Sequence, residues 1–415
     1  MVEISEKLIH QRIQARYSVA QAALVRRLGN LDQAEDAMQE AVVKALESWP
    51  RLGIPDNIVA WLVTAGMNAF RDGYRRESRG RELILEMAVT ERDHKEVADD
   101  LEDDVLRLIF MCCHPAIAVE NQLALTLKMV MGFSQTEIAS ALLVQERTLE
   151  QRITRSKRKI AATGIDFQLP DSSRLDVRLQ PVQQVLYLIF NEGYYGSSGT
   201  LLDQALCRNA IFLCRSLCRL YPQPENLGLL ALMLFQDARA PARLDEAGKL
   251  VTLDQQDRSL WRQVQIREAD VLLQKALRHG QADRYQLQAA IAGLHSLARR
   301  SEDTDWTEIV GLYKLLLQKQ PDPIVYLNYS VALMFDGQVK VSAPLLHELE
   351  PELGQYSPYW AARAKLAELQ GDQENRAAAL QTALKLSGSE EEMRHYELQL
   401  GAINKPRGIP GHRIH

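Results

Sequence analysis

A dense cluster of cationic side chains between residues 147 and 159 offers the clearest chemistry in this sequence. It consists of Arg147, Arg152, Arg155, Lys157, Arg158 and Lys159. Cations at this density can neutralise the phosphates of nucleic acid. Cations near the carboxyl end of a helix are also common in ordinary helical bundles, so the charges alone favour a solvated helix end. The residues around the cluster are needed to choose between these two interpretations.

The cationic cluster lies within residues 133–160, which predict two helices joined by a short turn. In chain order, the segment contains the N-cap residue Ser134, a helix over 135–142, the turn Leu143-Val144-Gln145 and a second helix from near Glu146. Glu137 completes a capping box with the N-cap residue. Leu149 and Ile153 form the apolar face of the second helix. The capped helix, the turn length and the basic second helix together favour a helix-turn-helix that lies in the major groove of DNA.

A second candidate site combines aromatic and cationic residues over 58–81. It follows an amphipathic helix over 34–49 and a loop in which prolines and a glycine break the helix. Its first half is apolar, its second half is rich in arginine, and Trp61, Phe70 and Tyr74 are interleaved. Rings stack on unpaired bases while arginines contact phosphates, which suits single-stranded nucleic acid. For Trp61, a place in the core is the favoured alternative.

Other patterns resemble chemical sites but are better explained as structure. Cys112-Cys113-His114 offers metal-ligating atoms, yet adjacent cysteines rarely bind one tetrahedral ion and no second pair lies nearby. The glycine-rich stretch 191–199 lacks the Gly-Lys-Ser/Thr ending of a phosphate loop. No nucleophile–base motif is evident, so we expect no metal, no cofactor and no catalytic residue.

The composition predicts an all-α protein with several domains. The chain has 415 residues and a formal net charge of -5, so positive charge for binding DNA must be local. Apolar residues recur at three and four positions along most of the chain, which is the period of helices. No apolar run is long enough to span a membrane, and five cysteines form no disulfide framework. These features predict a cytoplasmic protein.

The periodic segments and the linkers between them divide the chain. In chain order we expect a helical domain over 1–81, an acidic linker over 82–105, the helix-turn-helix domain over 106–161, a linker over 162–181, a helical extension over 182–284, repeats over 285–400 and a flexible tail over 401–415. Gly337 and Gly371 lie 34 residues apart between apolar helices. That period resembles tetratricopeptide repeats, whose concave surface binds a protein or peptide. A purely structural solenoid is the alternative.

Residues 10–160 resemble the extracytoplasmic-function sigma factors, a group of the sigma-70 family. The helix over 34–49, the proline-containing loop and the segment over 61–76 look like their region 2, and the helix-turn-helix looks like their region 4. Each motif alone is weak, but the two occur in the right order and spacing. Leu143 departs from the pattern, because many helix-turn-helix proteins have glycine in this turn. Parts of residues 190–261 resemble the helical extension of one sigma-factor subgroup, where it replaces a separate anti-sigma protein.

The resemblance implies two partners, core RNA polymerase and promoter DNA. For region 2 it implies that Asp36, Gln39 and Glu40 face the clamp helices of the β′ subunit, and that the melted −10 element is read by Asn68, Asp72, Arg75 and Arg76. For region 4 it implies contact with the β flap and binding of the −35 duplex by Arg147, Thr148, Gln151, Arg152 and Arg155. Gln151 and Arg152 are the better base readers, because Gln pairs with adenine and Arg with guanine.

We therefore predict an alternative sigma factor without enzymatic activity, regulated by its own helical extension. A ligand-sensing helix-turn-helix regulator without a role in polymerase is the alternative, but it has no need of the region 2 pattern. An enzyme that uses cysteines or aspartates of the extension is a third interpretation, which assays on small substrates would test.

Overall fold

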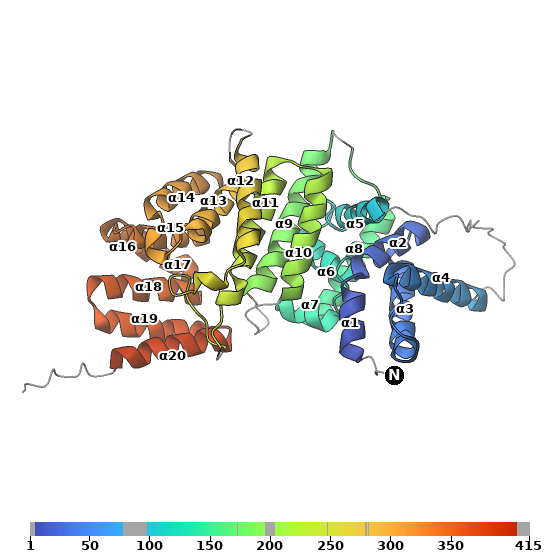
Figure 1. Cartoon of the computed structure of the whole chain (residues 1–415), viewed down its shortest axis with the longest axis horizontal. Coiled ribbons are helices and arrows are strands. Elements are labelled where there is room, and N and C mark those ends of the chain that lie inside the picture. Colours follow the sequence, from blue (N-terminus) through green and yellow to red (C-terminus); the bar gives the residue numbers. More distant parts are fainter. Residues whose placement is uncertain are drawn as a thin grey trace, which may run out of the picture. The chain divides into compact units, whose positions relative to one another are not determined.

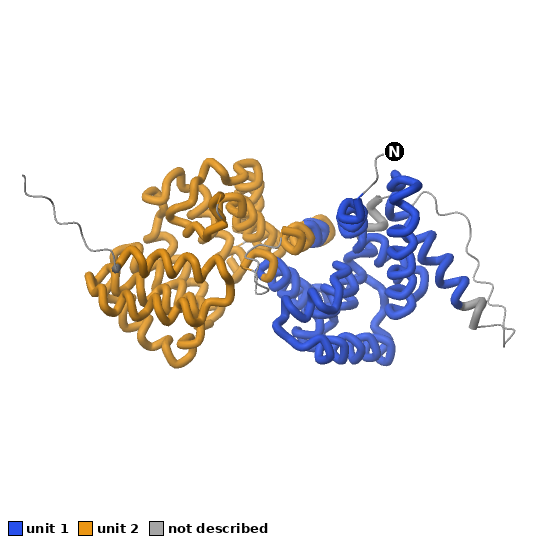
Figure 2. The backbone as a smooth tube through the Cα atoms, turned by 90° about the horizontal axis from the view of Figure 1, so that it is seen from below, with its two compact units in different colours: residues 1–191, 212–217 blue, residues 192–211, 218–415 orange. Residues whose placement is uncertain are grey.

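The computed structural model describes residues 5–77, 98–171, 173–195, 204–246, 248–278, 280 and 282–404, with side chains except for 74–77, 98–102 and 404. In these ranges the regular structure is helical apart from one isolated β-bridge between Leu244 and Leu250. The predicted all-α fold is confirmed. The chain divides into two compact units (Figure 2). Unit 1 comprises residues 1–191 and 212–217, and unit 2 comprises residues 192–211 and 218–415.

Unit 1 contains both segments that the sequence singles out. Its first helices are α1 (Glu6–Gln14), α2 (Tyr17–Leu28), α3 (Leu31–Leu52), α4 (Ile58–Glu77), α5 (Ala98–Cys112), α6 (Val119–Met129), α7 (Gln135–Ala141) and α8 (Glu146–Thr163) (Figure 1). Asn30 caps α3, and the predicted apolar stripe of this helix is buried from Ala34 to Ala45. Trp49 on α3 meets Trp61 on α4 edge to face, with ring centroids 5.1 Å apart. Trp61 therefore packs against the core, in agreement with the prediction that it is a core residue rather than a base-stacking one.

The acidic linker predicted over 82–105 ends earlier than expected. Residues 82–97 lie outside the described residues, and α5 already begins at Ala98. Asp104 is fully buried in α5, with carboxylate oxygens 3.2 Å from Arg26 Nη1 and 2.6 Å from Arg107 Nη1. A buried carboxylate needs such partners, because desolvation would otherwise favour its neutral form. This acidic residue is thus part of the helical core and not of a solvated linker.

The second linker, predicted over 162–181, is also shorter than expected. Helix α9 spans Leu175–Tyr195, and its residues up to Asn191 belong to unit 1. Arg178 of α9 donates a hydrogen bond to the carbonyl oxygen of Phe110 at 2.7 Å and lies over that ring. The start of the predicted extension is therefore part of the unit that holds α7 and α8.

Unit 2 consists of packed helices. After α10 (Gln204–Leu220), which the two units share, come α11 (Pro224–Ala238), α12 (Gln263–Leu277), α13 (Arg284–Leu297), α14 (Trp306–Lys319), α15 (Pro323–Phe335), α16 (Val339–Glu348), α17 (Glu350–Leu353), α18 (Ser357–Gln370), α19 (Gln373–Leu386) and α20 (Glu390–Asn404). Three short 3-10 turns, Ala240–Ala242, Arg258–Leu260 and Ser301–Asp303, lie between them. Nearly every residue of α11 is buried, which makes it a central helix of this unit.

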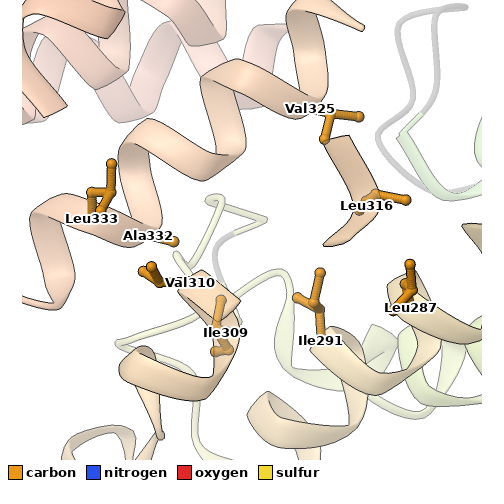
Figure 3. Packing of buried hydrophobic residues seen from close by; sticks show 8 residues of the cluster. All are labelled: Leu287, Ile291, Ile309, Val310, Leu316, Val325, Ala332 and Leu333. Carbon is orange, nitrogen blue, oxygen red and sulfur yellow. The ribbon is translucent and has the colours of Figure 1, made fainter. Parts of the chain in front are cut away.

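Helical hairpins occupy the region where repeats are predicted. Gly337 joins α15 to α16 and Gly371 joins α18 to α19, with left-handed φ angles of 78° and 76°. Helices α13, α14 and α15 meet in one apolar cluster (Figure 3), which comprises Leu287, Ile291, Ile309, Val310, Leu316, Val325, Ala332 and Leu333. Helices α18, α19 and α20 pack side by side (Figure 1). The helices are as the sequence predicts, whereas the assignment to tetratricopeptide repeats stays a prediction.

Candidate functional site

The predicted helix–turn–helix segment forms with the expected local geometry. Ser134 Oγ accepts a hydrogen bond from the Glu137 amide at 3.2 Å, and the Glu137 carboxylate accepts from the Ser134 amide at 2.7 Å. This is the predicted capping box, and it begins α7 where the sequence places it. In the turn, Leu143 has a φ of 50°, a left-handed conformation that favours glycine. Its side chain is 76% exposed.

Helix α8 presents one buried and one open face. Leu149 and Ile153 are buried, as their spacing predicts. Arg147, Thr148, Gln151 and Arg155 are exposed and Arg152 is half-buried. The residues predicted to bind duplex DNA are therefore accessible along this helix.

Two of the six predicted surface cations are used inside unit 1 instead. The Lys157 side chain is 10% exposed, and its ammonium donates to Asp32 Oδ1 at 2.8 Å and to the Glu35 carboxylate, both on α3. Burial lowers the pKa of Lys157, but the hydrogen bonds to the two carboxylates outweigh it and raise the pKa. Lys128 of α6 lies 3.1 Å from the same Glu35 carboxylate. Lys159 donates to the carbonyl oxygen of Ala116.

Helices α3 and α4 carry the remaining predicted residues. Asp36, Gln39 and Glu40 are exposed on α3, and Asn68 and Asp72 are exposed on α4. Arg75 and Arg76 belong to α4, but their side chains lie outside the described ones. Since positions three and four apart share a helix face, Asp36 and Gln39 adjoin Asp32 and Glu35, which contact α8.

Comparison with known proteins identifies the segment that bears these α3 and α4 residues. Sigma-70 region 2 matches residues 13–80, the stretch from α1 to beyond α4. The ECF RNA polymerase sigma factor EcfG of Rhodopseudomonas palustris (strain TIE-1) is 28% identical over 135 residues, which cover 32% of this chain and 72% of EcfG. Together, these two matches support a sigma-70 family factor.

The chain also has relatives of unknown function. A family of unknown function (DUF6596) matches residues 178–277, from within α9 to the end of α12. An uncharacterized protein of Rhizobium meliloti (strain 1021) is 42% identical over 390 residues, 92% of each chain, and the two proteins belong to one family. No solved structure matches the chain. Among the described residues, no helix combines the length and apolarity that crossing a membrane requires.

The segment that matches sigma-70 region 2 makes two further contacts, with the residues before α7. Gln14 Nε2 donates to the Met131 carbonyl oxygen at 2.6 Å. Tyr17 is buried, and a Cβ added to Gly132 would lie 2.6 Å from its ring. Burial and then the charge of Glu35 raise the Tyr17 pKa, so this phenol stays neutral. Local sequence patterns do not reveal these contacts, because each joins segments far apart in the chain.

The cysteines lie in the core. Cys112 and Cys113 are fully buried, and Cys113 Sγ lies 3.5 Å from Thr126 Oγ1. Burial raises the pKa of Cys112 well above its ordinary value and that of Cys113 to about 12. Thiolates bind metals and thiols do not, so this pair is a poor ligand at neutral pH. No group of metal-ligating side chains is present in the described ranges.

Proposed function

We propose that this sigma-70 family factor is an alternative sigma factor of the extracytoplasmic-function group, regulated by its own helical extension. The observation that carries the proposal is the combination of a region 2 match with a capped helix–turn–helix in the same compact unit. A regulator that binds only duplex DNA does not need a region 2. The factor positions polymerase and does no chemistry itself.

In this proposal, region 2 contributes an acidic face and a strand-binding helix. Asp36, Gln39 and Glu40 on α3 bind the β′ clamp helices of core RNA polymerase, and exposed carboxylates suit a basic partner surface. Helix α4 binds the melted −10 strand with Asn68, Asp72, Arg75 and Arg76. Opening the duplex costs stacking energy, which contacts to an extruded base partly recover.

Region 4 in this proposal comprises α7 and α8. Arg147, Thr148, Gln151, Arg152 and Arg155 bind the −35 duplex, and the apolar side of the domain meets the β flap. Four of these five side chains are exposed, which supports the assignment. Gln151 and Arg152 read base edges, and the other cations contact phosphates.

We infer from the ion pairs between α8 and α3 a resting state in which the factor does not bind a promoter. The −10 and −35 elements lie about 25 base pairs apart, roughly 85 Å of duplex at about 3.4 Å per base pair. Helix α8 spans only about 27 Å at 1.5 Å per residue. While Lys157 bonds to Asp32 and Glu35, region 2 and α8 cannot reach both elements at once. Promoter binding therefore requires these ion pairs to open.

In vitro transcription with purified core RNA polymerase tests the proposal. Templates carry the promoters upstream of the protein's own gene and its neighbours. Specific transcripts should appear with the full chain and fall at least tenfold with Asp36→Ala or Arg152→Ala. Glu47→Ala, an exposed acid on α3, and Arg174→Ala, an exposed cation outside α8, are matched controls that keep activity. Duplex binding without any polymerase-dependent transcript would favour the ligand-sensing regulator instead.

A further inference from the structure

Two carboxylates at the start of α3 are covered by lysines from distant helices of unit 1. The Lys157 ammonium on α8 donates to Asp32 Oδ1 at 2.8 Å and to the Glu35 carboxylate. Lys128 Nζ on α6 lies 3.1 Å from Glu35 Oε1. The side chains of Lys128, Lys157 and Glu35 are only 13%, 10% and 16% exposed, so this charge cluster is largely shielded from water. Ion pairs in such surroundings are stronger than those on an open surface.

The two covered acids continue into an open face of the same helix. Residues three and four apart share a helix face, so four later residues of α3 lie beside the covered acids. They are Asp36, Gln39, Glu40 and Val43, and all four are exposed. Val43, an apolar residue that is 50% exposed, adds a hydrophobic contact to the acidic face. A face that combines carboxylates with an exposed apolar side chain suits a cationic protein surface.

A protein that binds the open part of this face has to meet the covered part as well. Asp36 and Gln39 lie about 6 Å along the helix axis from Asp32 and Glu35, at 1.5 Å per residue. A typical interface buries about 800 Å² on each partner, a patch close to 30 Å across. A partner of that size on Asp36 and Gln39 therefore overlaps the positions of the lysines from α6 and α8.

The charges also determine what kind of partner can displace these lysines. Once α8 separates from α3, four carboxylates remain between residues 32 and 40, namely Asp32, Glu35, Asp36 and Glu40. Like charges one helical turn apart repel each other. A cationic surface removes this repulsion as the two lysines did, whereas a neutral or acidic surface does not. The covered acids therefore favour the same cationic partner as the open acids.

We propose that Asp32 and Glu35 belong to the face of α3 that binds a cationic surface of core RNA polymerase, and that α8 and α6 compete with polymerase for this face. The inference rests on the proposed function, in which Asp36, Gln39 and Glu40 bind the β′ clamp helices. It adds two residues to that site and a form of regulation. While Lys157 and Lys128 cover the two acids, the free chain binds polymerase with reduced affinity, in proportion to its open fraction.

Fluorescence anisotropy of the labelled full-length protein, titrated with purified core RNA polymerase, tests the competition. Lys157→Met should bind core polymerase at least fivefold more tightly than the parent, because the covering cation has been removed. Arg158→Met, an exposed cation on the same helix, should bind like the parent. If the parent binds and Lys157→Met binds no more tightly, α8 does not compete and the inference is wrong. If neither binds core polymerase, the proposed function fails first.

A second substitution tests whether Asp32 itself contacts polymerase. In the Lys157→Met background Asp32 has already lost its ion pair with α8, so Asp32→Asn removes no further bond to that lysine. It should nevertheless weaken the binding of core polymerase at least threefold. Glu6→Gln, an exposed acid on α1, is the matched control and should have no effect. An unchanged affinity with Asp32→Asn would restrict Asp32 to the contact with α8 and overturn its assignment to the polymerase face.

A covalent link between α3 and α8 tests the closed arrangement without weakening it. The variant that combines Asp32→Cys with Lys157→Cys can be joined by a short bismaleimide, because the five native cysteines are buried. The linked protein should bind core polymerase at least tenfold more weakly than the same variant without the link. Equal binding of the linked and unlinked proteins would show that polymerase does not need this face to open.

Discussion

A substitution at Gly132 tests the contact between Tyr17 and the turn before α7. A Cβ at Gly132, where φ is +72°, would lie 2.6 Å from the Tyr17 ring. Gly132→Ala should therefore lower the free energy of unfolding by about 2–4 kcal/mol, from left-handed strain together with steric overlap. Gly164→Ala is the matched control, because φ is +62° there and no atom lies within 4 Å of the added Cβ. Its loss should be about 1 kcal/mol, and urea unfolding of both variants measures the difference. Equal losses would contradict the Tyr17 contact.

The low pKa of the half-buried His295 should make the stability of unit 2 depend on pH. Burial, followed by the charges of Arg239 and Arg258, lowers this pKa to about 3 in the folded protein, whereas it is about 6.5 when unfolded, so below pH 6.5 the unfolded chain binds one more proton. As the pH is lowered from 6.5 to 3, the free energy of unfolding should therefore decrease by about 1.4 kcal/mol per pH unit. Above pH 6.5, His295 should not affect it. His295→Gln should reduce this slope in urea unfolding at pH 7, 6 and 5. His347→Gln, with a side chain 78% exposed, should retain the slope.

At the scale of elements, Lys157 should hold α8 against α3. Lys157→Met removes the cation from Asp32 and leaves Glu35 with Lys128 alone, so unit 1 should lose about 2–3 kcal/mol of stability. A double-mutant cycle with Glu35→Gln should give a coupling of about 1–3 kcal/mol. Arg158→Met, on the exposed face of the same helix, should leave stability unchanged.

Lys157→Met also tests the proposed resting state. If the contact between α3 and α8 has to open before a promoter is bound, Lys157→Met should raise the yield of specific transcripts. A several-fold rise in vitro, with Arg158→Met equal to or below the parent, would agree with this. A loss of transcription with Lys157→Met would instead assign Lys157 to DNA or polymerase binding.

For the whole molecule, the extension should be needed for activity as well as control. A chain that ends after Ile160 loses α9, and with it the hydrogen bond from Arg178 to Phe110. It should melt several degrees below a chain that ends after Leu220, which retains all of α9 and α10. Circular dichroism on heating measures this difference. If the chain ending at Ile160 transcribes as well as the full chain, the extension is dispensable and the prediction is wrong.

The local structure of this protein could be predicted from its sequence. The apolar stripe of α3, the capping box of α7 and the turn at Leu143 depend on residues within one or two helical turns of each other. Such contacts follow from the helical period and from caps, which the order of residues determines. The sequence patterns predict the wrong helix boundaries near α5 and α9, because acidic or proline-containing stretches can be helical once packing provides partners.

Only the tertiary structure decided which side chains are in contact. Lys157 and Asp32 lie 125 positions apart, and by local pattern Lys157 belongs with the exposed cations around it. The burial of Asp104 and the packing of Tyr17 on Gly132 have the same origin. The free energy of a charge depends on its surroundings more than on its neighbours in the chain. The sequence therefore determined the helices, and only the packing of those helices decided which charges are paired.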